Sequence, residues 1–169
     1  GSQPPVRISP PVPEAIQYLP FSPSSGGART VFRADMAGTG VHELFRASNS
    51  GPPAATIRLS VELSTSEPLW THRLDPESGR ALYGITTGSW PVEALYSVPI
   101  VGFPPQPVVL TPPAIGGDTP SIYEFRGTPG GSRVLFEMSR AIDQTTLWSV
   151  PVDGPASSAV RLTPGLPDA

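Results

Sequence analysis

A repeat with a period of about 51 residues limits the folds open to this chain more than any other feature of its sequence. A short run rich in Val, Ile and Leu recurs four times and ends in Ser or Thr, mostly followed by Pro. It occupies Val6–Pro10, Ile57–Ser60, Val108–Pro112 and Val160–Pro164. Self-similarity at a fixed period of roughly 20 to 50 residues indicates that one small structural unit has been copied along the chain.

Three further anchors recur in the same order between the copies of this run. One is a turn with a proline at Pro23, Pro76 and Pro129. The next is a run that begins at Arg29, Arg80 and Arg133, and the last is a run with an aromatic residue at Phe45, Tyr96 and Trp148. Four anchors in one order and at one period indicate three complete units.

Each unit is expected to form four strands, because short apolar runs alternate with Pro, Gly, Ser and Asp. The first strands are predicted at Ile16–Phe21, Leu69–Leu74 and Ile122–Arg126, and the second at Arg29–Ala34, Arg80–Thr86 and Arg133–Ser139. The third are predicted at His42–Ala47, Glu93–Pro99 and Thr145–Val152, and the fourth at Thr56–Val61, Pro107–Thr111 and Ala159–Thr163. A spare strand of the fourth type is expected at Val6–Ser9. No segment has helical periodicity, so we expect almost no helix.

These strands predict an all-β fold of three four-stranded antiparallel units. Four-stranded antiparallel meanders repeated every 40 to 50 residues or so are typical of β-propeller blades. We therefore expect a half-propeller in one domain, residues 1–169. Its units span about 6–56, 57–107 and 108–159, with a closing strand at 160–164.

The motifs of the units resemble TolB-type propeller repeats over about Val6 to Pro164. The resemblance lies in a Leu-Thr-Pro strand, a proline turn that ends in Gly, an Arg-x-Leu-Phe strand and a Leu-Tyr-x-Val-Pro strand. The turn departs from the Ser-Pro-Asp-Gly usual in that family, since it reads Ser22-Pro23-Ser24 in the first unit and Asp75-Pro76-Glu77 in the second. The units are also longer than usual. The resemblance implies a periplasmic or extracellular location, and the fold itself carries many unrelated activities.

Composition argues against several classes of function. There are 11 basic and 14 acidic residues, which gives a net charge of −3 and no basic footprint for nucleic acid or an anionic membrane. Cysteine is absent, and no apolar run is long enough to span a bilayer. We expect no metal or cofactor, because the two histidines, His42 and His72, have no further ligands at metal-binding spacing. A Gly-x-Ser-x-Gly nucleophile motif is also missing, so no catalytic residue is predicted.

Three blades are too few to close a propeller, since closed propellers have about four to eight. The two outer faces are therefore expected to expose apolar side chains. The apolar side chains expected on these two faces are those of Phe32, Phe45, Leu82, Tyr96, Leu135 and Trp148. Because exposed apolar patches usually mark interfaces, either the chain belongs to a longer protein or copies associate. We expect a homodimer that completes six blades.

Candidate binding residues come from the first strands, because the innermost strands of a propeller line its channel. Arg73, Glu124 and Arg126 are predicted to form a polar channel mouth, with His72 beside them, that binds a protein or peptide ligand. The competing interpretation is that these charges pair with one another at the surface. Trp90, in the turn Gly88-Ser89-Trp90-Pro91, is a candidate exposed anchor.

The function expected from these features is that of a non-enzymatic binding or scaffolding module. Two alternatives stay open at this point. One is a fragment of the propeller domain of a prolyl-oligopeptidase-like hydrolase, which a downstream Gly-x-Ser-x-Gly motif would favour. The other is a sugar-binding propeller, which a glycan array with Trp90→Ala as control would test.

Overall fold

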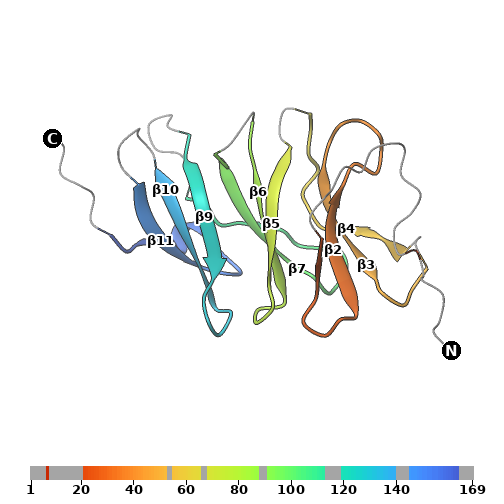
Figure 1. Ribbon diagram of the computed structural model, residues 1–169. Coiled ribbons are helices and arrows are strands. Elements are labelled where there is room, and N and C mark those ends of the chain that lie inside the picture. The colour runs from red at the N-terminus through yellow and green to blue at the C-terminus, as the bar shows by residue number, and fades with distance from the viewer. Residues whose placement is uncertain are drawn as a thin grey trace.

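The computed structural model contains three four-stranded antiparallel sheets that follow one another along the chain (Figure 1). It describes residues 7, 21–52, 55–65, 68–87, 91–112, 119–139 and 145–163. The first sheet has the order β1 (Phe21–Pro23), β2 (Arg29–Ala34), β3 (Glu43–Ser48) and β4 (Ile57–Arg58). This all-β arrangement is consistent with blade-like repeats.

The second and third sheets repeat this meander. The second consists of β5 (Leu69–Asp75), β6 (Arg80–Ile85), β7 (Ala94–Pro99) and β8 (Val108–Val109). The third consists of β9 (Ser121–Gly127), β10 (Arg133–Ser139), β11 (Thr145–Pro151) and β12 (Val160–Arg161). A 3-10 turn at Ala156–Ser158 lies between β11 and β12.

The tight turns follow from the residues that the repeat places there. In the second sheet, Pro76 begins the turn between β5 and β6, and Gly79 ends it with a φ of 67°. The Gly79 amide donates to the Asp75 carbonyl at 3.1 Å, which closes the turn. Proline presets one turn dihedral and glycine accepts a positive φ without strain, so this sequence favours a sharp reversal.

Each sheet has two distinct faces, because side chains alternate along a strand. We call the face toward the next sheet in the chain the forward face and the opposite one the rear face. The forward face of the first sheet carries Val31, Leu44 and Leu59, which join a core with the rear face of the second. The forward face of the second carries Leu82, Leu95 and Leu110, which join a core with the rear face of the third. The sheets therefore stack forward face to rear face.

Every rear face carries a stacked aromatic pair from its two middle strands. The pairs are Phe32 with Phe45, Tyr83 with Tyr96, and Phe136 with Trp148, with ring centroids 6.1, 5.1 and 6.5 Å apart. Their interplanar angles of 28°, 9° and 15° show that all three are stacked. A stacked aromatic pair stabilises a fold by about 0.5–1.5 kcal/mol beyond the contribution of its buried area. Because the pair is repeated in all three sheets, it stabilises each unit in the same way.

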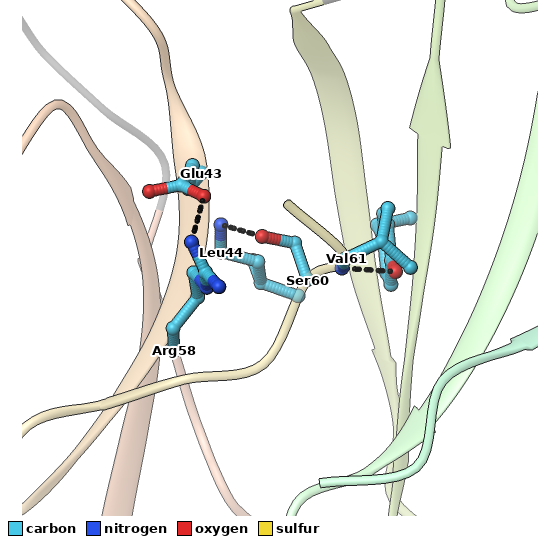
Figure 2. Close-up of polar contacts among 6 residues, drawn as sticks. Glu43, Leu44, Arg58, Ser60 and Val61 are labelled. Carbon is cyan, nitrogen blue, oxygen red and sulfur yellow. Dashed lines mark hydrogen bonds and ion pairs between the residues drawn. The ribbon is translucent and has the colours of Figure 1, made fainter. Parts of the chain in front are cut away.

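Polar contacts hold the first and second sheets together. The Arg46 guanidinium donates to the carbonyls of Ile100 and Gly102, the latter at 2.6 Å. Just beyond β4, the Ser60 hydroxyl accepts a hydrogen bond from the Leu44 amide at 3.3 Å, and the Val61 amide donates to the hydroxyl of Tyr83 at 3.1 Å (Figure 2). The first of these bonds lies within the first sheet, and the second ties the chain to the second sheet directly after it leaves the first.

Two sequence predictions about strands need correction. The fourth strands were expected to span five or six residues, but β4, β8 and β12 each pair over only two. In the first sheet, the amides of Leu59 and Ser60 both donate to the Leu44 carbonyl, so the chain turns out of the ladder there. The first strand of the first unit pairs at Phe21–Pro23, and the remainder of the predicted Ile16–Phe21 lies outside the described residues, as does Val6–Ser9 except for Arg7.

The expectation that both outer faces expose apolar side chains was wrong for most of the residues named. Leu82 and Tyr96 belong to the middle sheet and pack in its two cores, and Trp148 packs against the core between the second and third sheets. On the rear face of the first sheet, Phe32 and Phe45 are only 9% and 7% exposed. Only Leu135, on the forward face of the third sheet, lies on an uncovered side of the stack.

Candidate functional site

A groove runs between β5 and β9, the first strands of the second and third sheets, which lie side by side (Figure 1). At one end, next to the proline turns, is a hollow of about 300 Å³ that we call the acidic hollow. It is lined by Arg73, Leu74, Asp75, Pro76, Glu77, Leu82, Arg126, Gly127, Thr128 and Pro129. Further along β5 a second hollow of about 110 Å³, the aromatic hollow, is lined by Trp70, Thr71, Arg73, Tyr123, Glu124 and Phe125. Both hollows share Arg73, so they form one groove.

Three of the predicted binding residues meet in the middle of this groove. The Glu124 carboxylate lies 2.9 Å from Nη2 of Arg73 and 3.3 Å from Nε of Arg126. The Arg73 guanidinium also lies 5.9 Å from the centre of the Phe125 ring, within cation–π range. These side chains are 37–73% exposed, and exposed ion pairs contribute little to stability. A charged ligand can therefore exchange with them at small cost.

Asp75 is the buried polar group of the acidic hollow. Its side chain is only 5% exposed. Oδ1 accepts a hydrogen bond from the Glu77 amide at 3.3 Å, while Oδ2 is buried and has no hydrogen-bond partner in the described part of the chain. A buried carboxylate oxygen left unpaired is costly. An N–H donor that enters the hollow would remove that cost.

Close packing across the two sheets explains how Asp75 is held. A Cβ at Gly127 would lie 2.7 Å from the Asp75 carboxyl carbon, so only glycine leaves room for this carboxylate. The neighbouring turns also touch. A Cβ at Gly131 would collide with the Ser78 backbone nitrogen, and the Gly130 amide donates to the Glu77 carboxylate. The hollow is thus built by the contact between two turns one repeat apart.

The aromatic hollow depends on a repeated irregularity in the first strands. The ladder between β5 and β6 shifts register at Trp70, and the ladder between β9 and β10 shifts register around Tyr123. A β-bulge changes the direction in which the side chain of the extra residue points. Trp70 and Tyr123 are accordingly 42% and 40% exposed, although both lie within strands.

The structure brings Arg73, Glu124 and Arg126 together. The three side chains form ion pairs with one another. These are the contacts expected if the charges only neutralise one another at the surface. His72 does not reach the groove: it is 6% exposed and its register partner is Tyr83, whose side chain packs toward the first sheet. Trp90 lies outside the described residues.

His72 is instead a neutral histidine between the first and second sheets. Burial, together with the nearby charge of Arg33, lowers its pKa to about 4. Neither ring nitrogen has a hydrogen-bond partner in the described part of the chain. Arg33 itself is fixed by the carbonyls of Leu69 and Trp70, to which it donates at 3.1 and 2.7 Å. This histidine belongs to the packing between the sheets.

Sequence reasoning missed the other groove residues, Trp70, Tyr123, Asp75 and Glu77. A signal was available for the aromatic residues, because Trp70 and Tyr123 occupy matching positions in two units. No comparable signal existed for Asp75, because its environment is created by Gly127 of the next unit.

Two further observations bear on the kind of site. Among the described residues, no three His, Cys, Asp or Glu side chains are grouped so that they could hold a metal ion. The same residues contain no helix that is both long and apolar enough to cross a bilayer. Comparisons of the sequence with known protein families and with curated proteins found no match.

Proposed function

We propose that this chain is a non-enzymatic binding module, built as part of a TolB-like β-propeller, that binds an extended peptide segment in the β5–β9 groove. The observation that carries the proposal is the buried, unpaired carboxylate oxygen of Asp75, a residue that lines the acidic hollow. Buried polar atoms in proteins are nearly always hydrogen-bonded. A donor supplied by a ligand accounts for an acceptor placed in this way.

The shape of the groove supports a peptide as the ligand. Two hollows of about 300 and 110 Å³ lie in succession along one strand, and both are open to solvent. Small-molecule pockets usually enclose most of the ligand in a single cavity. An extended chain, whose side chains point alternately to either side, can instead place successive groups in two shallow hollows.

The chemistry of the groove indicates what such a peptide carries. Three carboxylates, Asp75, Glu77 and Glu124, outnumber the two arginines, Arg73 and Arg126, at this end of the groove, so its formal charge is −1. The unpaired Asp75 oxygen therefore favours an N–H donor, best supplied by a Lys or Arg side chain. Trp70 and Tyr123 offer apolar contact to a neighbouring side chain, and aromatic residues are frequent anchors in interfaces. Arg73 and Glu124 between them can pair with ligand charges of either sign. The preferred peptide is thus basic at one end and apolar at the other.

Selection from a random peptide library on the immobilised protein, followed by calorimetric titration of the selected peptides, tests this proposal. We expect selected sequences to contain a basic residue a few positions from an apolar one. Asp75→Asn keeps the size of the side chain but removes its charge, and it should weaken binding about tenfold or more, the usual loss for a charged hydrogen bond.

Glu43→Gln is the matched control. Glu43 also pairs with an arginine, Arg58, at 3.0 Å (Figure 2). It lies on β3 of the first sheet and lines neither hollow of the groove. It should leave peptide affinity unchanged. The proposal fails if no peptide is selected, or if Asp75→Asn and Glu43→Gln bind the selected peptides equally well.

A further inference from the structure

In each sheet an arginine begins the second strand and lies diagonally across from one residue of the third strand. In the second sheet Arg80 donates from Nε to the Ser97 hydroxyl at 2.6 Å and from Nη2 to the Ser97 carbonyl at 3.4 Å. In the third sheet Arg133 makes the same two contacts with Ser149, at 2.6 and 3.1 Å. A serine at this position therefore gives the arginine two acceptors.

The first sheet has a second arginine in place of that serine. The register partner of Arg29 is Ser48, and Arg46 lies two residues before Ser48 on the same strand. Arg29 and Arg46 are therefore diagonal neighbours on the forward face, within reach of each other for side chains of this length. The Arg29 amide is bonded to the Ser24 hydroxyl, but its side chain has no hydrogen bond or ion pair with the described residues.

Arg46 is buried and fixed in place beside Arg29. It is only 7% exposed, and its guanidinium donates to the carbonyls of Ile100 and Gly102 in the loop between β7 and β8. Burial and the nearby charge of Arg29 both lower the pKa of Arg46. In the part of the chain that the structure describes, no carboxylate forms an ion pair with either arginine. Two positive charges thus lie together without an anion to balance them.

The equivalent place between the second and third sheets is neutral. Burial lowers the pKa of Arg80, and the nearby carboxylate of Asp153, in the loop between β11 and β12, acts in the opposite direction. The matching residue in the β7–β8 loop is Val101, since each of the two residues precedes a glycine of positive φ, Gly102 at 89° and Gly154 at 76°. The matched positions therefore hold two arginines between the first and second sheets, but one arginine and one aspartate between the second and third.

Two neighbouring arginines without a carboxylate partner suit a ligand oxyanion, because guanidinium groups bind phosphate and carboxylate groups through paired N–H donors. A phosphate monoester carries a charge of about −1.5 to −2 at pH 7, which balances two arginines better than a single carboxylate does. We propose that Arg29 and Arg46, where β2 and β3 meet the β7–β8 loop, bind a phosphate group, either free or as a monoester.

The same loop also offers apolar contact to the remainder of a monoester. Val101 and Phe103, on either side of Gly102, are 51% and 79% exposed. Neither these residues nor the two arginines line a hollow of the β5–β9 groove. The inference therefore adds a second site to the proposed peptide binding.

Calorimetric titrations with inorganic phosphate, phenyl phosphate and acetate, at pH 7.5 and constant ionic strength, test the proposal. We expect both phosphates to bind saturably and acetate to bind at least about tenfold more weakly, since it carries a single charge. Tighter binding of phenyl phosphate than of inorganic phosphate would identify a monoester as the ligand, and equal affinities would identify free phosphate. Acetate binding as tight as that of phosphate would overturn the assignment to phosphate.

One pair of variants tests the arginines. Arg29→Met should weaken phosphate binding about tenfold or more, the usual loss when a charged hydrogen bond is removed. Arg133→Met is the matched control, because it makes the same change at the matching position of the third sheet, where Ser149 stands in place of a second arginine. It should leave the affinity for phosphate unchanged.

A second pair tests the missing carboxylate without disturbing the core. Val101→Asp places a carboxylate where the next sheet has Asp153, and because Val101 is exposed the variant should fold normally. It should lose phosphate binding, whereas Val101→Asn, which has the same size without the charge, should keep it. Three results would refute the site: no saturable phosphate binding, equal losses in Arg29→Met and Arg133→Met, or equal affinities in the two Val101 variants.

Discussion

The buried histidine between the first and second sheets should make the protein sensitive to mild acid. His72 is 6% exposed, and its pKa is lowered from 6.5 to about 4 by burial and by Arg33. Between these two pH values the unfolded chain binds a proton that the folded protein does not, so acid favours unfolding. The loss begins as the pH falls through 6.5 and is complete near pH 4.

The size of this effect follows from the pKa difference. Each pH unit in the window removes up to about 1.4 kcal/mol from the free energy of unfolding. From pH 7 to pH 4 the contribution of His72 therefore reaches about 3 kcal/mol, a large part of the total stability of a typical domain. His72→Leu removes the titrating group and the two unpaired ring nitrogens together, so its stability should depend much less on pH over this range.

Urea unfolding at several pH values between 4 and 7 measures this effect. The relevant quantity is how steeply the free energy of unfolding falls with pH in the original protein compared with His72→Leu. The carboxylates titrate in both proteins, so the difference between the two slopes isolates the contribution of His72. His42→Gln is the matched control, since burial also lowers the pKa of His42 but this residue is only partly buried. Parallel curves for the original protein and His72→Leu would refute the reasoning.

Two further substitutions test how the sheets are joined. Arg46→Met should lower the free energy of unfolding by about 2–3 kcal/mol, because it leaves two backbone carbonyls of the second sheet without their charged donor. Arg58→Met, which removes only an exposed ion pair, should cost less than about 1 kcal/mol; equal losses in urea unfolding would contradict this account. Gly131→Ala should destabilise the protein by more than Gly130→Ala, although both glycines have positive φ (62° and 85°), because only the first brings a Cβ against the Ser78 backbone. Equal melting temperatures for the two alanine variants would show that the turns of neighbouring units do not touch.

The repeat made most of the fold predictable. Strand positions such as Arg29–Ala34 and Arg133–Ser139 agree with the structure to the residue, because turns rich in Pro and Gly mark where each strand begins and ends. The fourth strands were predicted too long. Their apolar residues continue past the ladder, since Leu59 and Leu110 are buried by the neighbouring sheet and not by strand pairing.

Which apolar face stays open could not be read from the pattern alone. Alternation shows that neighbouring residues such as Leu135 and Phe136 lie on opposite faces of one strand, but not which of the two faces another sheet covers. For the same reason, His72 was placed at the channel mouth with Arg73, although the two side chains point to opposite sides of β5. Arg73 and Arg126 occupy aligned positions of β5 and β9, and Glu124 lies two residues before Arg126 on the same side of β9. The cluster forms because Glu124 pairs both with Arg126 on its own strand and with Arg73 on the neighbouring sheet.

The groove exists because the third sheet packs its rear face on the forward face of the second. The backbone marker of this contact is an isolated antiparallel bridge, in which the Val92 amide donates to the Ile122 carbonyl at 3.2 Å and the Ile122 amide to the Val92 carbonyl at 2.7 Å. In an NMR spectrum of the amide-protonated protein, the account predicts a nuclear Overhauser contact between these two amide protons and slow hydrogen exchange at both. Fast exchange at both amides without that contact would show that the second and third sheets do not stack as described.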